Sequence, residues 1–172
     1  MKQTITARAF LTVRHDQAYA YNEKRGIWLY KCGPEEEVGN ILTDAGRVAI
    51  HTYLYGSAGQ RTTASLGPDG LSYIGLTDDA SPPVDGDTSL TGEISGNGLS
   101  RVQSAVTLPT GTGAITSLQH QFTYTGGAAQ GVQKTALFDA SSGGNMAHEI
   151  LFTQRILATN DTLTVTFNIS LS

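Results

Sequence analysis

The sequence predicts a mainly β protein, an antiparallel, jelly-roll-like β-sandwich with one short helix and an extended N-terminal arm. Three observations lead to this prediction: apolar residues alternate with polar ones along many short segments, turn residues separate those segments, and charge is sparse. The 172 residues include 20 glycines, and charged residues make up only 15% of the chain. This length suits one domain with an arm better than two independent domains.

Residues 1–38 are predicted to form the N-terminal arm, which contains strands. Apolar residues fall on alternate positions from Ile5 to Val13, the period of a strand buried on one face. An aromatic stretch follows, with residues 27–32 as a second strand, and Gly33-Pro34 and an acidic run close the arm. Its aromatic residues would be costly to expose singly, so we expect them to pack against a neighbouring subunit or against the sandwich of the same chain. These candidate interface residues are Tyr19, Tyr21, Trp28 and Tyr30.

Residues 39–172 are predicted to form the sandwich domain, which opens with a helix over about residues 40–55. Apolar residues recur there at spacings of three and four, which gives the helix one apolar stripe. Asn40 or Thr43 could cap its start, and Gly56 could end it.

The rest of the chain alternates in the manner of β-strands. Two short runs lie around residues 71–76 and 101–108, and a long polar loop, 77–98, separates them. Several strands so close together in sequence are typical of a two-layer sandwich with hairpin or Greek-key connections. The most regular runs, bounded by glycine-rich or Asn-Asp turns, are residues 118–124, 132–138, 146–152 and 163–171.

No pattern typical of an enzyme or a metal site is visible, so we expect no catalytic, cofactor-binding or metal-ligating residues. The sequence contains neither Gly-x-Ser-x-Gly nor His-Glu-x-x-His, and its four histidines are far apart. Cys32 is the single cysteine, which excludes an intrachain disulfide and a thiol-based zinc site. A sandwich-fold hydrolase would need a specific acid such as Glu93 or Glu149, and nothing in the sequence places two acids across a cleft.

The charge and hydropathy patterns argue against nucleic acid and membranes as partners. The net charge of -4 provides no concentrated positive field for phosphate groups. No apolar run reaches the roughly 18 residues that span a bilayer, and no apolar segment follows the first residues. We therefore expect synthesis and retention in a cytoplasm until assembly or lysis.

Several segments after residue 40 carry a family resemblance. They are the expected short helix at residues 40–47, the strand and loop of residues 73–82, the acidic residue and arginine at Glu93 and Arg101, and the closing segments 136–140, 143–146 and 161–167. Over residues 40–172 the chain resembles the small structural proteins of tailed-phage virions: capsid decoration, minor tail and fibre-associated β-sandwich proteins. It departs from their pattern at Lys134 and Ala136, where such proteins often carry an acidic residue and a glycine.

The resemblance implies a non-enzymatic virion component of a tailed bacteriophage that acts by subunit association and needs no cofactor. It would be a capsid decoration (cement) protein or a tail or baseplate subunit. A small sandwich with an arm can bury surface on several neighbours at once, which favours the capsid. The expected partners are the major capsid protein or tail and baseplate proteins, together with further copies of the chain in a homo-oligomer, expected to be a trimer.

The alternative function is a glycan-binding module that recognises the host surface. Its candidate groups are the tyrosines and the aspartates of the polar loop, with calcium as an optional ligand of the carboxylates. The spacing of these aspartates matches no EF-hand loop, so a solvated, turn-forming loop is the simpler interpretation. The aspartates are Asp78, Asp79, Asp85 and Asp87.

Overall fold

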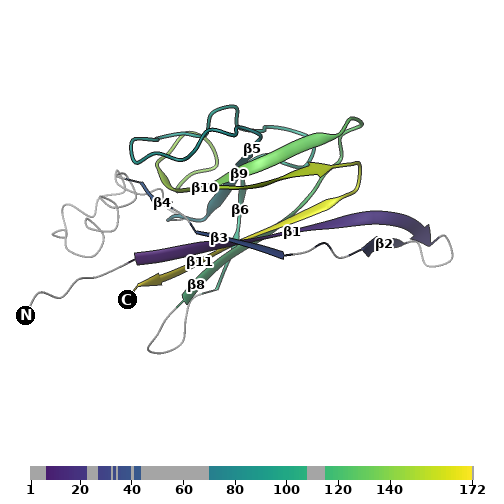
Figure 1. Ribbon diagram of the computed structural model, residues 1–172, viewed down its shortest axis with the longest axis horizontal. Helices are drawn as coiled ribbons and strands as arrows, with labels where there is room; N and C mark the ends of the chain where they lie inside the picture. The colour runs from purple at the N-terminus through teal and green to yellow at the C-terminus, as the bar shows by residue number, and fades with distance from the viewer. Residues whose placement is uncertain are drawn as a thin grey trace, which may run out of the picture.

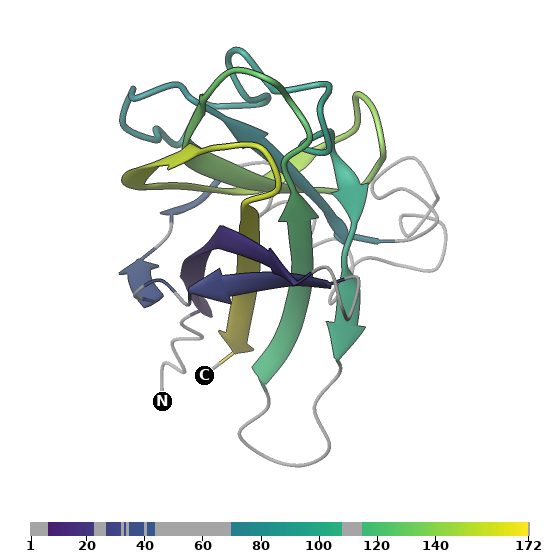
Figure 2. The same ribbon diagram turned by 90° about the vertical axis from the view of Figure 1, so that its right-hand side faces the viewer.

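The computed structural model describes residues 7–22, 27–31, 33, 35–39, 41–43, 70–107 and 115–171, and these form an all-β sandwich of two antiparallel sheets (Figure 1; Figure 2). The predicted fold class, a mainly β sandwich, is confirmed. No helix in these ranges is long and apolar enough to cross a membrane. The strands are β1 (Ala7–Asn22), β2 (Ile27–Lys31), β3 (Glu35–Gly39), β4 (Ile41–Leu42), β5 (Tyr73–Thr77), β6 (Val102–Gln103), β7 (Ala105–Thr107), β8 (Ile115–Thr123), β9 (Gln130–Phe138), β10 (Met146–Leu157) and β11 (Thr162–Leu171).

The strands of the last third of the chain are divided between the two sheets. Within the described residues, the first sheet has the order β2–β1–β11–β8–β7, with β3 also paired to β1, and the second has the order β4–β10–β9–β5–β6. The β9–β10 hairpin lies in the second sheet, whereas β8 and β11, which flank it in sequence, pair with each other in the first. The chain therefore crosses between the layers before and after this hairpin, which joins the sheets into one sandwich.

The core lies between the two sheets and follows the alternation seen in the sequence. On β11, Leu163, Val165 and Phe167 are fully buried, while the residues between them face outward. β1 contributes Val13 from the same sheet, with no exposed surface. The opposite sheet completes this core with residues that include Ile74, Leu76, Val132, Leu137, Ile150 and Leu157.

The predicted start of the helix is wrong. Ile41–Leu42 is a short strand, β4, which pairs with His148 and Glu149 of β10. The Thr43 hydroxyl donates a hydrogen bond to the carbonyl oxygen of Met146 on β10, at 2.8 Å. Pairing with the open edge of β10 satisfies backbone groups here, a long-range effect that the local spacing of apolar residues does not reveal. Residues 44–55, the rest of the predicted helix, lie outside the described residues.

The structure narrows the predicted arm. Ala7–Asp16 pairs with Thr162–Leu171 of β11, so this part of β1 belongs to the sandwich. The acidic run at residues 35–37, predicted to close the arm, lies instead in β3, which pairs with residues 10–14 of β1. Beyond Asp16, β1 continues with β2 as a hairpin that extends past the second sheet (Figure 1). We call residues 17–31 the hairpin arm; the division of the chain at residue 38 stays a prediction.

Candidate functional site

Asp161 fixes the base of the hairpin arm. This buried residue lies in the turn between β10 and β11, where its Oδ2 is 2.8 Å from His15 Nε2 and accepts a hydrogen bond from Ala158 N at 2.9 Å. Its Oδ1 accepts a hydrogen bond from Ala18 N at 3.1 Å. Since His15 and Ala18 lie on either side of the point where β1 leaves β11, one carboxylate holds the strand as the arm begins.

A second carboxylate joins the two ends of the hairpin arm. Buried Asp16 accepts hydrogen bonds from Arg14 Nε at 3.0 Å and from Gly33 N at 3.3 Å. A Cβ atom at Gly33 would lie 2.0 Å from the carbonyl oxygen of His15, so only glycine fits there. The chain therefore leaves and re-enters the sandwich at one tightly packed point.

The hairpin arm contains the four predicted interface residues. Tyr21 is opposite Trp28 in the β1–β2 register, and Tyr30 is opposite Ala18. A register shift between Ala18 and Ala20 leaves Tyr19 in a β-bulge, an irregularity that increases the local twist of a strand. The backbone pairing of β1 with β2 brings all four aromatic residues into one hairpin. Their role as an interface stays a prediction.

The outer face of the first sheet is an open, polar surface. Neighbouring strands place Thr12 opposite Thr166 and Thr166 opposite Gln119, so the row crosses three strands. Within it, Gln119 Nε2 donates a hydrogen bond to Thr166 Oγ1 at 2.9 Å. Hydroxyl, amide and guanidinium groups on this face can hydrogen-bond to a partner. The groove on this face is lined by Thr12, Arg14, Gln119, Gln121, Thr164 and Thr166.

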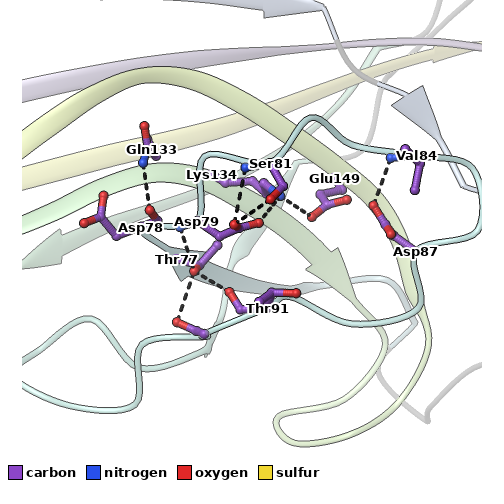
Figure 3. Close-up of polar contacts among 11 residues, drawn as sticks. Thr77, Asp78, Asp79, Ser81, Val84, Asp87, Thr91, Gln133, Lys134 and Glu149 are labelled. Atoms are coloured by element: carbon purple, nitrogen blue, oxygen red, sulfur yellow. Dashed lines mark hydrogen bonds and ion pairs between the residues drawn. The ribbon is translucent and has the colours of Figure 1, made fainter.

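The outer face of the second sheet is covered by residues 78–92, which we call the covering loop (Figure 3). Buried Leu90 packs with Ala136, Phe138 and Met146 in a second apolar cluster. At the base of the loop, the Thr77 hydroxyl lies 2.6 Å from the carbonyl oxygen of Thr91 and accepts a hydrogen bond from the Asp79 amide at 3.1 Å. The covering loop therefore has both a pinned base and an apolar attachment to the sheet.

A charged cluster with two buried members, Lys134 and Glu149, lies beneath the covering loop (Figure 3). Lys134 Nζ of β9 is 2.6 Å from Asp79 Oδ2 and 3.2 Å from Glu149 Oε1 of β10. Burial acts to lower the pKa of Lys134, but its hydrogen bonds to Asp79 and Glu149 together raise it. Burial, reinforced by a hydrogen bond with Asp87, raises the pKa of Glu149 to about 7. Glu149 therefore holds a proton at pH values where an exposed glutamate is ionised.

Glu93 and Arg101, singled out in the sequence, form a clamp beside the covering loop. Arg101 binds the Glu93 carboxylate through two hydrogen bonds of 2.7 and 2.6 Å. Its guanidinium carbon lies 3.4 Å from the centre of the Phe138 ring, and it donates hydrogen bonds to the carbonyl oxygens of Ala140 and Gly143. The bidentate geometry fixes the chain after the loop onto the sheet, which is a structural role.

The aspartates of the polar loop are engaged with protein groups. Asp78 accepts a hydrogen bond from Gln154 Nε2 at 2.7 Å, and Asp87 accepts one from Val84 N at 2.9 Å. In the described part of the chain, no group of three or more His, Cys, Asp or Glu residues could hold a metal ion. The calcium-assisted alternative therefore finds no site in these ranges.

The sequence analysis missed Lys134 and Glu149 as a pair. Lys134 alternates with Ala136 and Phe138 on β9, and a charge among buried apolar residues requires a partner. That alternation was a usable signal, but it did not identify the partner, which is adjacent only in the folded sheet.

One comparison with known protein families gives a match, and no curated protein matches the chain. The family model described as podophage GP4 fiber I protein gp80 matches residues 57–170, more than half of the sequence. This range contains the covering loop, the charged cluster, β5 to β10 and most of β11, whereas the hairpin arm lies outside it. The chain therefore belongs to the podophage GP4 fiber I protein gp80 family, and it is a non-enzymatic structural component of a phage fibre and so of the virion.

Proposed function

We propose that the chain is a tail-fibre subunit that acts by association with neighbouring subunits, and that the hairpin arm makes a principal contact. The family match over residues 57–170 is the observation that carries the fibre assignment. The arm lies outside the matched residues and continues past the second sheet (Figure 1). Its base is held by Asp16 and Asp161, so docking would order few additional backbone groups there.

The aromatic content of the arm supports a contact surface. Tyrosine and tryptophan are enriched at the centres of protein interfaces, where a few such residues supply most of the binding free energy. The proposed contact residues are Tyr19, Tyr21, Trp28 and Tyr30, and the proposed partners are other fibre or tail proteins and further copies of the chain. A trimer is the proposed oligomer. The earlier preference for the capsid has no support from the family, which is a fibre family.

The test compares an arm variant with a variant of the open polar face. Trp28→Ala with Tyr30→Ala should reduce incorporation into particles by about tenfold or more, as expected for interface hot spots, without lowering the thermal stability of the free chain. Gln119→Ala is the control and should be incorporated normally. Quantitative mass spectrometry of purified particles measures both, and normal incorporation of the arm variant would exclude the arm as the contact.

The position of the protein in an electron-microscopy map of the intact particle tests the fibre assignment separately. Labelled protein should lie on fibres that emerge from the tail. Density over the capsid shell would contradict the fibre proposal and would return the function to capsid decoration.

A second candidate function is glycan binding at the open groove of the first sheet. The observation that favours it is the convergence of six hydrogen-bonding side chains, including Arg14, Gln121 and Thr164, on one groove. Sugar hydroxyls would find both donors and acceptors there. Glycan arrays should show binding that a chelator leaves unchanged and that Gln121→Ala weakens. Arrays without signal would exclude this function, whereas loss of signal with the chelator would favour the calcium-assisted form.

A further inference from the structure

Two carboxyl groups meet beneath the covering loop. Glu149 comes from β10 and has a side chain that is 2% exposed, while Asp87 comes from the loop. Their interaction acts to raise the pKa of Glu149 and to lower the pKa of Asp87, as a hydrogen bond from Glu149 to Asp87 would. Ionised carboxylates only accept hydrogen bonds, so this contact requires a proton on one of them. Glu149 Oε2 is buried and meets no hydrogen-bond donor among the residues that the structure describes, so this oxygen is where the proton is needed.

The charges described around Glu149 would not neutralise its carboxylate if the proton were lost. Within the described ranges, Lys134 is the one cation of the cluster, and Asp79 is its closer partner, at 2.6 Å against 3.2 Å for Glu149. With both Asp79 and Asp87 ionised, loss of the proton would leave three negative charges beside a single positive one. The register partners of Glu149 on β4 and β9, Ile41 and Ala136, carry no charge.

We propose that the covering loop is a proton-dependent strap, closed over the second sheet while Glu149 and Asp87 share a proton and loosened when that proton leaves. Loosening moves Leu90 away from Ala136, Phe138 and Met146, the apolar cluster that it covers. The Glu93–Arg101 clamp and the Thr77 contacts hold the two ends of the strap, so opening is confined to the loop. The strap thus controls access to an apolar patch on the outer face of the second sheet.

The direction of the pH dependence follows from the two states. In the closed state the pKa of Glu149 is raised to about 7, whereas an exposed glutamate has the ordinary value of 4.5. The closed state therefore binds the proton more tightly, and opening becomes easier as the pH rises from 4.5 to 7 and then levels off. The pKa values of Asp79 and Asp87 are lowered from 3.8, chiefly by hydrogen bonds to Lys134 and Val84, so neither titrates in this range.

Hydrogen exchange of the full chain tests the strap. After correction for intrinsic exchange rates, amides of residues 79–87 should exchange on the order of a hundredfold faster at pH 8 than at pH 5. In Glu149→Gln the side-chain amide can donate to Asp87 at any pH, so the rise should fall to less than about threefold. Asp85→Asn is the control, because Asp85 is an exposed loop carboxylate, and the full rise should remain.

Two results would overturn the proposal: equal corrected exchange at pH 5 and pH 8 in the unmodified chain, or an undiminished rise in Glu149→Gln. If that variant does not fold, carboxyl carbon chemical shifts of Glu149 in the unmodified chain decide instead. A titration midpoint near pH 7 supports the strap, and a midpoint near pH 4.5 excludes it.

Discussion

The outer faces of the two sheets differ in what covers them. On the second sheet, the outward side chains Ala136, Phe138 and Met146 lie beneath the covering loop, together with the buried pair Lys134 and Glu149. The outward side chains of the first sheet are threonines, glutamines and an arginine around an open groove. Both faces follow the same strand alternation, so the chemistry at every second position distinguishes a face closed by its own chain from a face available to a partner.

The largest expected effect on folding comes from removing β1, the strand that runs through both the hairpin arm and the first sheet. Deleting residues 1–38 should prevent folding, because it removes Val13 from the core and leaves β11 without the partner that β1 supplies. Deleting residues 18–30 and closing the chain with a glycine linker should leave a folded sandwich. Circular dichroism with thermal melting distinguishes the two deletions. A cooperative transition in the larger deletion would show that residues 1–38 are an arm, as the sequence predicts.

The covered face should be sensitive to loss of its buried cation. Lys134→Ala leaves Glu149 and Asp79 without their counter-ion and should lower the free energy of unfolding by about 3 kcal/mol. Gln119→Ala on the open face should change it by less than about 0.5 kcal/mol. Urea titrations at pH 7 measure both variants. Similar losses in the two variants would remove the energetic distinction between the faces.

The apolar contacts of Leu90 in the covering loop should contribute somewhat less to the free energy of unfolding than Lys134 does. Leu90→Ala creates a cavity against Phe138 and Met146 and should cost about 2 kcal/mol in the free energy of unfolding. Val106→Ala, at a position 45% exposed, is the comparison from the first sheet and should cost less than about 0.5 kcal/mol. If the urea midpoint of Leu90→Ala equals that of the unmodified chain, the loop does not pack as described.

The smallest expected effect is the pH dependence of stability that comes from His148 and Glu149, adjacent residues on opposite faces of β10. Burial lowers the pKa of His148 from 6.5 to about 4, so its contribution to stability is lost as the pH falls through this range. Burial raises the pKa of Glu149 from 4.5 to about 7, so its contribution is lost as the pH rises. The two contributions oppose each other between pH 4.5 and 6.5, and the stability of the unmodified chain should be nearly constant there.

Single variants should separate the two opposing pH dependences of stability. With increasing pH, stability should fall in His148→Gln, where Glu149 acts alone, and rise in Glu149→Gln, where His148 acts alone. Urea midpoints at half-unit intervals from pH 4.5 to 7 measure this difference. Parallel profiles in the two variants would contradict the assigned pKa directions.

The predictability of each strand depends on whether its own residues alternate between apolar and polar side chains. The strands of the last third were predicted within a few residues, because Leu163, Val165 and Phe167 alternate and turns bound them. β3 was missed because its three glutamates look like a turn. It is stabilised by its ladder with residues 10–14 of β1 and by β10, where Glu36 accepts hydrogen bonds from Thr153 N at 3.1 Å and from Arg155 Nη2 at 2.5 Å. Local patterns contain no information on such partners.

The candidate sites divide in the same way. The aromatic residues of the hairpin arm were singled out by their residue type, and Glu93 and Arg101 by the family resemblance. The proton shared by Glu149 and Asp87 depends on a loop folding back over a distant strand, so residue types alone could not reveal it.

The continuity of β1 gives the molecule a mechanical property. One strand runs from the hairpin arm into the first sheet, where residues 10–14 lie between β11 and β3. A pull on the arm along this strand loads both neighbouring ladders in shear, so many backbone hydrogen bonds resist together instead of opening one after another. Tension applied at the arm would therefore pass directly into the sandwich, with Asp161 and the close packing at Gly33 opposing bending at the junction.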